Sequence, residues 1–301
     1  MTSRHRAYIL LSGAALFWAG NFVLARAVHA AVPPIGLAFW RWAVVGLFVV
    51  PWAWRELRAQ WPVMRAHAGL MILLGMLSVG AFNTLIYVGV QTASAIDALM
   101  LISAIPAFIL VLAPVILGNR LARREILGVF VSGLGVLTVL THGHPWSMTD
   151  LFDNSGTLWI LAGVLSWALY SVLLRRLPAA IFGRGLFAAT VIVGLVTLLP
   201  FYLWETYGQY RPVTLSLTLL WSVAYTAFFA SVLAYLAWNK GVALIGVERA
   251  GIFIHLMPAF GLLLSAFWLK EHITIADGAG LTFILVGLTI STARYTSRRV
   301  A

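Results

Sequence analysis

Long apolar stretches alternate with short polar segments along almost the whole chain. Helices cross a bilayer with about 20 apolar residues, and ten stretches approach or reach that length. They cover residues 7–27, 34–54, 68–90, 95–117, 125–141, 156–174, 185–204, 216–239, 248–269 and 274–293. Because the segments between them are mostly short and marked by Pro, Gly or charge, the pattern predicts an all-α integral membrane protein with ten transmembrane helices.

The composition agrees with a membrane protein. Hydrophobic residues make up 62% of the 301 residues, charged residues only 10%, and the mean hydropathy is +0.96. A soluble domain carries about 25% charged residues, so this chain has too little polar surface to cover a water-soluble globule. The chain has no cysteine, which excludes disulfides and thiolate metal sites.

The distribution of Lys and Arg predicts the orientation of the helices. With the N-terminus in the cytoplasm, sixteen of the 20 Lys and Arg residues fall in cytoplasmic segments. Arg26, Arg211 and Lys270 fall outside, and Arg41 lies within a predicted helix. Positive charge concentrates on the cytoplasmic side, so both termini are predicted to be cytoplasmic. The net charge of +11 then reflects topology, and no nucleic-acid partner is expected. An alternative reading of residues 4–30 is a signal peptide, but the apolar run is long for one.

The second half of the chain resembles the first. At an offset of 152 residues, Ser103–Phe108 aligns with His255–Phe260, and at an offset of 149, Trp18-Ala19 aligns with Trp167-Ala168. We therefore predict two repeats, 1–148 and 149–301. Five helices per repeat is an odd number, so the second repeat enters the membrane from the opposite side and the repeats are inverted. Inverted repeats are typical of transporters, with the solute in a central cavity between the copies.

Polar and aromatic residues at matched depths in the two repeats are the candidate substrate-binding residues, because lipid does not offset their desolvation. Trp18 and Asn21 are three positions apart and share one helix face, and Asn83 and Tyr87 share another. The repeat pairs Trp18 with Trp167, Asn21 with Tyr170, Asn83 with Tyr235, Tyr87 with Asn239, and Ser103 with His255. We expect these side chains to line one pocket.

Each candidate also has a simpler structural interpretation. Trp and Tyr gather at membrane interfaces, which fits Trp42, Trp52, Trp54, Trp61, Trp204, Tyr202 and Tyr207. Asn83 and Asn239 can join helices by hydrogen bonds, and a lone His255 is more often a packing residue than a proton relay. For Arg41 we favour a side chain that extends toward the interface or contacts a loop over an anion site.

Two prolines and five glycines occupy related positions in the repeats. Pro106 and Pro258 fall near mid-helix, where a proline removes a backbone hydrogen bond and bends the helix. We predict that they act as hinges, with static curvature as the alternative. Close packing of 125–141 against 274–293 is expected at Gly128, Gly133, Gly135, Gly280 and Gly287.

The interior is poor in acidic residues. No Asp or Glu falls near the middle of a predicted helix. Ion-coupled carriers usually keep a buried carboxylate, so its absence favours uncoupled or weakly coupled transport and argues against a cationic substrate. The chain also lacks a Gly-x4-Gly-Lys phosphate loop and a His-Glu-x2-His motif. We therefore expect no enzyme activity, no cofactor and no metal.

The second half carries motifs of a known family. It reads Tyr235-Leu-Ala-Trp238-Asn239-Lys240-Gly241, then Met257-Pro258-Ala259, then Leu269-Lys270-Glu271. This resembles the EamA-type half of the drug/metabolite transporter superfamily, and the first half matches more weakly. The resemblance implies a ten-helix monomer in the inner membrane with alternating access to its central cavity. It also adds Trp238 to the substrate-binding candidates.

The resemblance also suggests a substrate. The Ala234–Gly241 run and the Trp18/Trp167 pair resemble the superfamily's bacterial exporters of aromatic amino acids. Ile105 and Met257 stand where the family often has Glu before proline, which leaves the coupling mechanism open. We predict an exporter of amino acids, aromatic ones above all, whose partners are a small-molecule solute and the lipid bilayer. The alternatives are export of another metabolite or drug, such as a purine or riboflavin, or a membrane protein that transports nothing.

Overall fold

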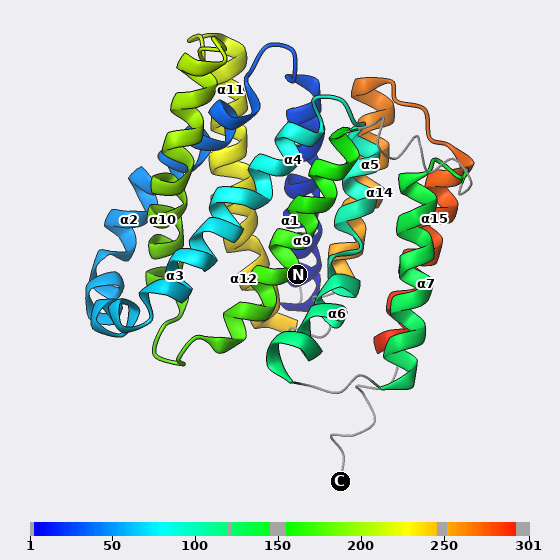
Figure 1. The fold of residues 1–301 in the computed structure, drawn as a ribbon, viewed down its shortest axis with the longest axis horizontal. Coiled ribbons are helices and arrows are strands. Elements are labelled where there is room, and N and C mark those ends of the chain that lie inside the picture. The colour runs from blue at the N-terminus through cyan, green and yellow to red at the C-terminus, as the bar shows by residue number, and fades with distance from the viewer. Residues whose placement is uncertain (1–2, 119–121, 145–154, 246–251, 293–301) are drawn as a thin grey trace.

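The computed structural model describes residues 3–118, 122–144, 155–245 and 252–292. Within these ranges the chain forms helices and no strands (Figure 1). Six helical segments of the described residues are long and apolar enough to cross a membrane, and the bent pair α5–α6 would make a seventh. The remaining three predicted stretches are also helical, as α7, as α14 continued by η6, and as α15.

The helices of the first half follow the predicted stretches. The first two are α1 (Ser3–Ala27) and α2 (Pro34–Ala66). The third segment is made of α3 (Ala68–Gly75), π-helical η1 (Met76–Phe82) and α4 (Asn83–Gly89). The pair α5 (Ala95–Ile102) and α6 (Ile105–Leu117) follows, and then α7 (Arg123–Leu140). Local sequence explains the ends. Pro34 begins α2, where its missing N–H costs nothing. Ser94 and Asp97 form a capping box at the start of α5.

The second half repeats this order. Its first two segments are α9 (Ser155–Leu173) with 3₁₀ segment η2 (Leu174–Arg176), and α10 (Gly183–Leu203) with π-helical η3 (Trp204–Gly208). The third segment is made of α11 (Leu217–Ala224), π-helical η4 (Tyr225–Leu233) and α12 (Ala234–Ile245). The last two are 3₁₀ segment η5 (Ile252–His255) with α14 (Leu256–Leu264) and π-helical η6 (Ser265–Leu269), and α15 (Ile275–Thr292). Both third segments therefore contain a π-helical stretch, and such stretches are frequent at functional sites.

One helix is longer than the sequence predicts. The α2 helix continues past residue 54 to Ala66 and includes Pro51 and Pro62. Past residue 54 its buried side chains are Leu57, Gln60 and Met64. This spacing of three and four residues keeps one face of a helix against the protein. A search for uniformly apolar stretches misses an amphipathic extension of this kind.

The two predicted hinge prolines lie beside breaks in the helices rather than inside them. Pro106 is the second residue of α6, just after a 42° bend between α5 and α6. At that position its missing N–H has no partner in the helix in any case. Pro258 is the third residue of α14, which follows the 3₁₀ segment η5. The expectation that each proline removes a mid-helix hydrogen bond is wrong, while a hinge role stays a prediction.

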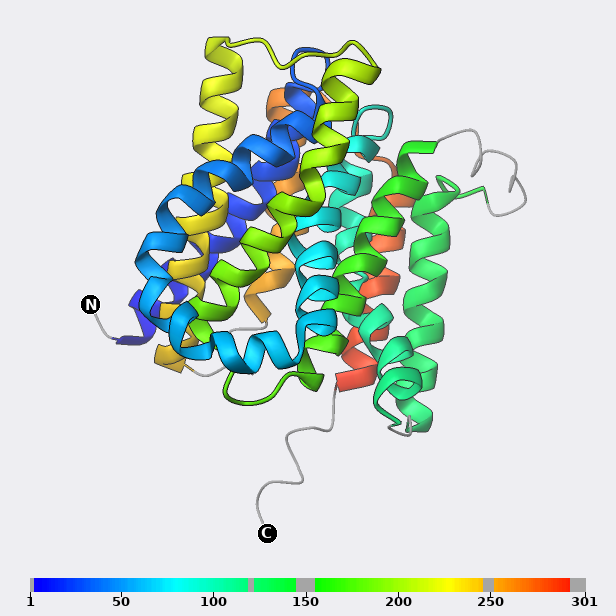
Figure 2. The ribbon, with the colours of Figure 1, turned by 60° about the vertical axis from the view of Figure 1, so that its left-hand side comes forward.

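The helices pack in pairs that connect the two halves. The α2 helix packs against α10 at one edge of the molecule, and α7 packs against α15 at the other (Figures 1 and 2). Between these edges, α1 packs against α12 and α14, while α9 packs against α4 and α6. The buried core lies along α1, α4, α5 and α9. Large apolar side chains such as Leu47, Trp221 and Phe267 are exposed on the outside, as a lipid-facing surface requires.

Glycines bring α7 and α15 into close contact. A Cβ atom on Gly135 would lie 2.6 Å from the carbonyl oxygen of Gly280. A Cβ atom on Gly128 or Gly287 would likewise meet the backbone of the other helix. Gly133 has open space around it, so the expected packing role is wrong for this glycine because it lies on another face of α7. Ser132 fixes the register by donating a hydrogen bond to the carbonyl oxygen of Ile284 at 3.2 Å.

Candidate functional site

A buried arginine stands at the centre of a polar cluster inside the helix bundle. Arg41 lies about 10 Å along α2 from Pro34, at 1.5 Å per residue, and its side chain is only 4% exposed. Its Nη1 carries two hydrogens, which three oxygens share: Asn21 Oδ1 at 3.1 Å, Asn83 Oδ1 at 2.9 Å and the Tyr87 hydroxyl at 2.7 Å. Its Nε donates to Ser231 Oγ at 2.9 Å. We call these five residues the Arg41 cluster.

Four different helical segments supply the Arg41 cluster. Asn21 comes from α1, and Asn83 and Tyr87 come from successive turns of α4. The Tyr87 hydroxyl donates a hydrogen bond to Asn21 Oδ1 at 2.7 Å, so the cluster is also linked without Arg41. Ser231 lies in η4 and donates its proton to the carbonyl oxygen of Thr226 at 2.8 Å. That bond leaves the Ser231 oxygen free to accept from Arg41.

Three of the predicted substrate-binding residues therefore meet in one place, and Arg41 joins them unexpectedly. The expectation that Arg41 extends toward the interface is wrong, because its guanidinium is buried among side chains of three other segments. Trp42 was assigned to the interfacial belt, yet it is only 7% exposed. The guanidinium carbon of Arg41 lies 4.9 Å from the Trp42 ring centre.

Aromatic rings of both halves touch beside the Arg41 cluster. The Trp18 ring lies 5.4 Å from the Trp238 ring, and Trp18 Nε1 donates a hydrogen bond to the carbonyl oxygen of Ala230 at 3.1 Å. Trp167 contacts two aromatic residues, Phe82 at 4.7 Å and Tyr170 at 5.1 Å between ring centres. The Phe82 residue immediately precedes Asn83. The structure thus brings Trp18, Trp167 and Trp238 into aromatic contacts between helices, whereas Tyr170 contacts Trp167 within α9.

The other predicted residues lie elsewhere. Ser103 is buried but donates its hydrogen bond to the carbonyl oxygen of Leu99 in the preceding turn. Tyr235 stacks on Phe187 at 5.2 Å and is partly exposed. Asn239, which the repeat pairs with Tyr87, is exposed and does not join the Arg41 cluster. His255 ends η5, and its side chain lies outside the described residues.

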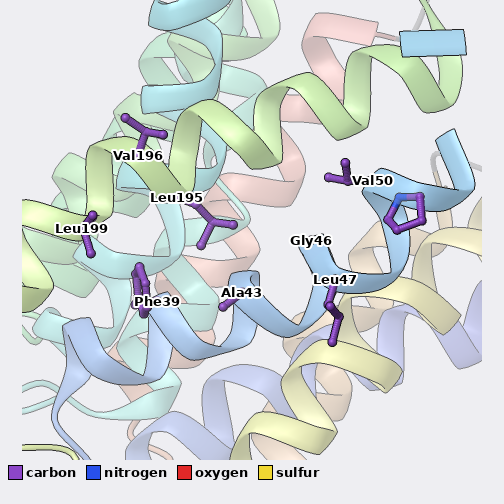
Figure 3. A pocket seen from close by; sticks show the side chains of 9 residues that line it. Phe39, Ala43, Gly46, Leu47, Val50, Leu195, Val196 and Leu199 are labelled. Carbon is purple, nitrogen blue, oxygen red and sulfur yellow. The ribbon is translucent and has the colours of Figure 1, made fainter. Parts of the chain in front are cut away.

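Two hollows lie along α2. One has a volume of about 560 Å³ and is an apolar groove between α2 and α10, lined by residues such as Phe39, Leu47 and Leu195 (Figure 3). The other has a volume of about 250 Å³, and it adjoins the Arg41 cluster through Ser231. Its walls are the side chains of Phe48, Val49, Trp52, Phe187, Ser231, Val232, Tyr235 and Leu236. We call it the Ser231 hollow.

Comparison with known proteins identifies the family. The model of the EamA-like transporter family matches the chain twice, over residues 5–141 and 154–293. The chain belongs to the EamA-like transporter family. It is therefore a multi-pass membrane transporter, and the family resemblance noted in the sequence is confirmed at that level.

Individual relatives of this EamA-like transporter agree with the family match. The chain is 30% identical over 287 residues to uncharacterized transporter YyaM of Bacillus subtilis, covering 93% of this chain and 92% of that protein. It is 25% identical over 296 residues to a protein of Salmonella typhimurium named "Probable amino-acid metabolite efflux pump", covering 94% of each. The fold is similar to that of a solved structure titled "Crystal structure of protein", with a TM-score of 0.61 and 18% sequence identity. The match covers 96% of this chain and 97% of the chain in that structure. This last match shows the fold alone.

Sequence reasoning missed the central role of Arg41 in this EamA-like transporter. The signal was present, because Arg41 is the one charged residue of the predicted stretch 34–54, and ionisable residues within membrane helices generally mark functional sites. The flanking Trp40 and Trp42 favoured an interfacial position instead. Among the described residues, no group of three or more His, Asp or Glu side chains could hold a metal ion.

Proposed function

We propose that this protein is a secondary transporter that exports amino acids, aromatic ones above all, by alternating access between two inverted five-helix repeats. Membership of the EamA-like family carries the transport activity. The aromatic contacts of Trp18 with Trp238, and of Trp167 with Phe82 and Tyr170, carry the aromatic preference. The printed name of the Salmonella relative supports amino-acid metabolites as the solute class.

Contacts between corresponding helices support inverted repeats. Gly128 contacts Gly287, and Gly135 contacts Gly280, so α7 and α15 run antiparallel. Gly280 and Gly287 are the counterparts of Gly128 and Gly135, 152 positions later. Each of the two contacts is therefore the repeat-related copy of the other. Two repeats inserted in the same direction would place corresponding helices parallel to each other.

The contact of α2 with α10 supports the same arrangement. Glu205, at the end of the α10 segment, accepts hydrogen bonds from the backbone N–H groups of Ile35 at 3.1 Å and Gly36 at 2.6 Å. Its counterpart 149 positions earlier, Glu56, forms an ion pair with Arg184 at the start of α10. Each carboxylate thus reaches the first turn of the other long helix. The two family-model matches support the repeat boundary near residue 148.

Transport into liposomes tests the proposed function. Purified protein reconstituted in liposomes should move radiolabelled Phe or Trp across the bilayer faster than liposomes without protein. A competition panel of other amino acids, a purine and riboflavin would separate the aromatic preference from the alternative solutes. Absence of flux for every amino acid would contradict the proposal, and competition by riboflavin or the purine alone would favour the alternative.

Single cysteines test topology and alternating access, because the chain has none of its own. Tyr210 and His67 are both exposed and lie on opposite sides in the proposed topology. A Tyr210→Cys variant should react with a membrane-impermeant maleimide in intact cells, and a His67→Cys variant only after permeabilisation. The reverse pattern would place the N-terminus outside. A cysteine introduced at Ser103 should change its reaction rate when Phe is added, if access alternates.

A further inference from the structure

Arg41 is a buried positive charge whose partners are all neutral. A guanidinium remains protonated in proteins, so the charge is permanent. Each hydrogen bond from Arg41 ends on an amide or hydroxyl oxygen, supplied by Asn21, Asn83, Tyr87 and Ser231. The ion pairs of the described chain are Arg26 with Glu271 and Arg184 with Glu56. Within the described residues, therefore, no carboxylate lies within 4 Å of the Arg41 guanidinium.

Neutral partners position a charge without cancelling it. A buried charge is generally paired with an opposite charge as well as hydrogen-bonded, and ionisable residues inside membrane helices pair with one another or with backbone carbonyls and mark solute pathways. The four partners hold Arg41 from α1, α4 and η4, so the guanidinium cannot turn toward water without breaking these bonds. The arrangement is that of a site built to receive an anion.

Two further donors of the cluster are unused. Among the described residues, Arg41 donates through Nε and Nη1 only, which leaves Nη2 without a hydrogen bond. The Nε1 group of Trp42 is buried without a partner among the described residues. A carboxylate accepts two or more N–H donors and binds a guanidinium through two of them. The cluster has donors to spare, and this favours an acceptor ligand with a negative charge.

The Ser231 hollow supplies space for the rest of such a ligand. Ser231, which accepts from Arg41 Nε, lines this hollow of about 250 Å³. Four of its wall residues are aromatic, namely Phe48, Trp52, Phe187 and Tyr235. Trp42 joins the guanidinium to this wall, since its ring lies 6.4 Å from Phe187 in an edge-on contact. Arg41 does not itself line the hollow, and Phe48, Trp52 and Tyr235 are 52%, 51% and 37% exposed, so the hollow opens to the outside of the bundle. A ligand with a carboxylate and an apolar or aromatic body would reach the guanidinium beside Ser231 and rest its body against this wall.

We propose that Arg41 binds the carboxylate of the transported solute and that the Ser231 hollow holds its apolar part. Asn21, Asn83, Tyr87 and Ser231 position the guanidinium. The link to transport rests on the proposed function, but the anion site itself does not. The inference narrows the solutes to carboxylates and separates them from purines, riboflavin and simple amines.

Three probes with the same aromatic ring test the site by binding alone. L-phenylalanine and 3-phenylpropionate carry a carboxylate, and L-phenylalaninamide does not. Thermal unfolding of the purified protein in detergent should shift upward with the first two and not with the amide. Equal shifts with all three, or no shift with either carboxylate, would overturn the proposal, as would protection by chloride or inorganic phosphate alone.

An Asn21→Asp variant gives the sharpest test, because it places a carboxylate against Nη1, where Asn21 Oδ1 lies at 3.1 Å. This internal counter-charge should preserve or raise the unfolding temperature without ligand. It should weaken carboxylate binding by about tenfold or more. The control is Gln209→Glu, which adds the same charge at an exposed position and should bind as the unmodified protein does. A folded Asn21→Asp protein with unchanged affinity would overturn the proposal.

Substitution of Arg41 itself completes the test. Arg41→Lys should retain part of the carboxylate binding, while Arg41→Gln should lose it. Flux in liposomes then separates the two proposals. Carboxylates that bind in an Arg41-dependent way without being moved would contradict the proposed function and support the anion site. Equal flux of solutes that carry a carboxylate and solutes that do not would contradict the anion site while supporting the proposed transport function.

Discussion

The carboxylate of Glu271 lies 3.8 Å from Nε of Arg26. The same carboxylate accepts hydrogen bonds from the backbone N–H groups of Ala95 at 3.1 Å and Ile96 at 3.2 Å, at the start of α5. Arg26 in turn donates to the carbonyl oxygens of Val90 and Gln91 at the end of α4. Two side chains therefore tie the ends of α1, α4, α5 and η6 together on the proposed outer side.

Replacing Glu271 with Gln should loosen this junction. The change removes the ion pair and weakens two hydrogen bonds at the positive end of a helix, so a loss of about 1–2 kcal/mol in stability is expected. Thermal unfolding in detergent measures it. Glu125→Gln is the matched control, because among the described residues Glu125 accepts only one hydrogen bond, an exposed one from Ala122 at the start of its own helix. Equal losses in both variants would show that the junction adds nothing beyond a helix cap.

Replacing Gly135 with Ala should disrupt the contact of α7 with α15. The added Cβ would lie 2.6 Å from the carbonyl oxygen of Gly280 and 2.8 Å from the backbone N of Ile284. Backbone atoms cannot give way as a side chain can, so we expect a loss of about 1–3 kcal/mol. Gly133→Ala, two positions away in open space, should be neutral or slightly stabilising. The comparison is made by unfolding in detergent, and equal effects would contradict the packing role.

Replacing Asn83 with Ala should weaken the Arg41 cluster. Asn83 Oδ1 accepts from Arg41 at 2.9 Å in a buried position, and loss of a hydrogen bond to a charged group costs about 1.5–3 kcal/mol. Asn239→Ala, at the position that the repeat pairs with Tyr87, should change stability by less than about 0.5 kcal/mol because the side chain is exposed. A large effect of Asn239→Ala in the same unfolding assay would restore it as a buried partner.

Replacing Trp167 with Ala should impair transport more than folding. The Trp167 ring contacts Phe82 and Tyr170, and we expect initial flux of aromatic amino acids in liposomes to fall by about tenfold, the effect of losing a contact of about 1.4 kcal/mol. Trp159→Ala removes the same side chain from an exposed position on α9 and should transport normally. Unchanged flux with Trp167→Ala would exclude this residue from the solute pathway.

Much of the fold could be predicted from the sequence because apolar length and local caps decide it. Every predicted stretch corresponds to a helical segment, and the predicted start at residue 95 coincides with the start of α5, which Ser94 caps. The extension of α2 was missed because only every third or fourth side chain there is buried. The bend between α5 and α6 lies ahead of Pro106 rather than at it. Pro106 therefore indicated where the helix is interrupted, but not that the interruption is a break between two helices.

The candidate site was predicted in part, because a repeat fixes the depth of a residue but not the face it occupies. Asn21, Asn83 and Tyr87 meet as their spacing on α1 and α4 indicates. Asn239, which the repeat pairs with the buried Tyr87, is exposed. The π-helical stretch before it, η4 over Tyr225–Leu233, is longer than η1, so the two third segments are not exact copies. The burial of Arg41 depends on three segments distant in sequence, and no local pattern encodes it.

The glycine contact between α7 and α15 also bears on the origin of the chain. Each half presents two glycines at equivalent positions to the other, Gly128 and Gly135 on α7 and Gly280 and Gly287 on α15. Ser132 meets Ile284, its own counterpart 152 positions later. Such a self-complementary contact is the geometry of a two-fold homodimer. If the repeats are inverted, as we propose, an ancestral polypeptide of half this length would already carry the surface needed to associate with a second molecule inserted the opposite way round. Gene fusion would then have joined two such molecules, already held together by the glycine contact, into one chain.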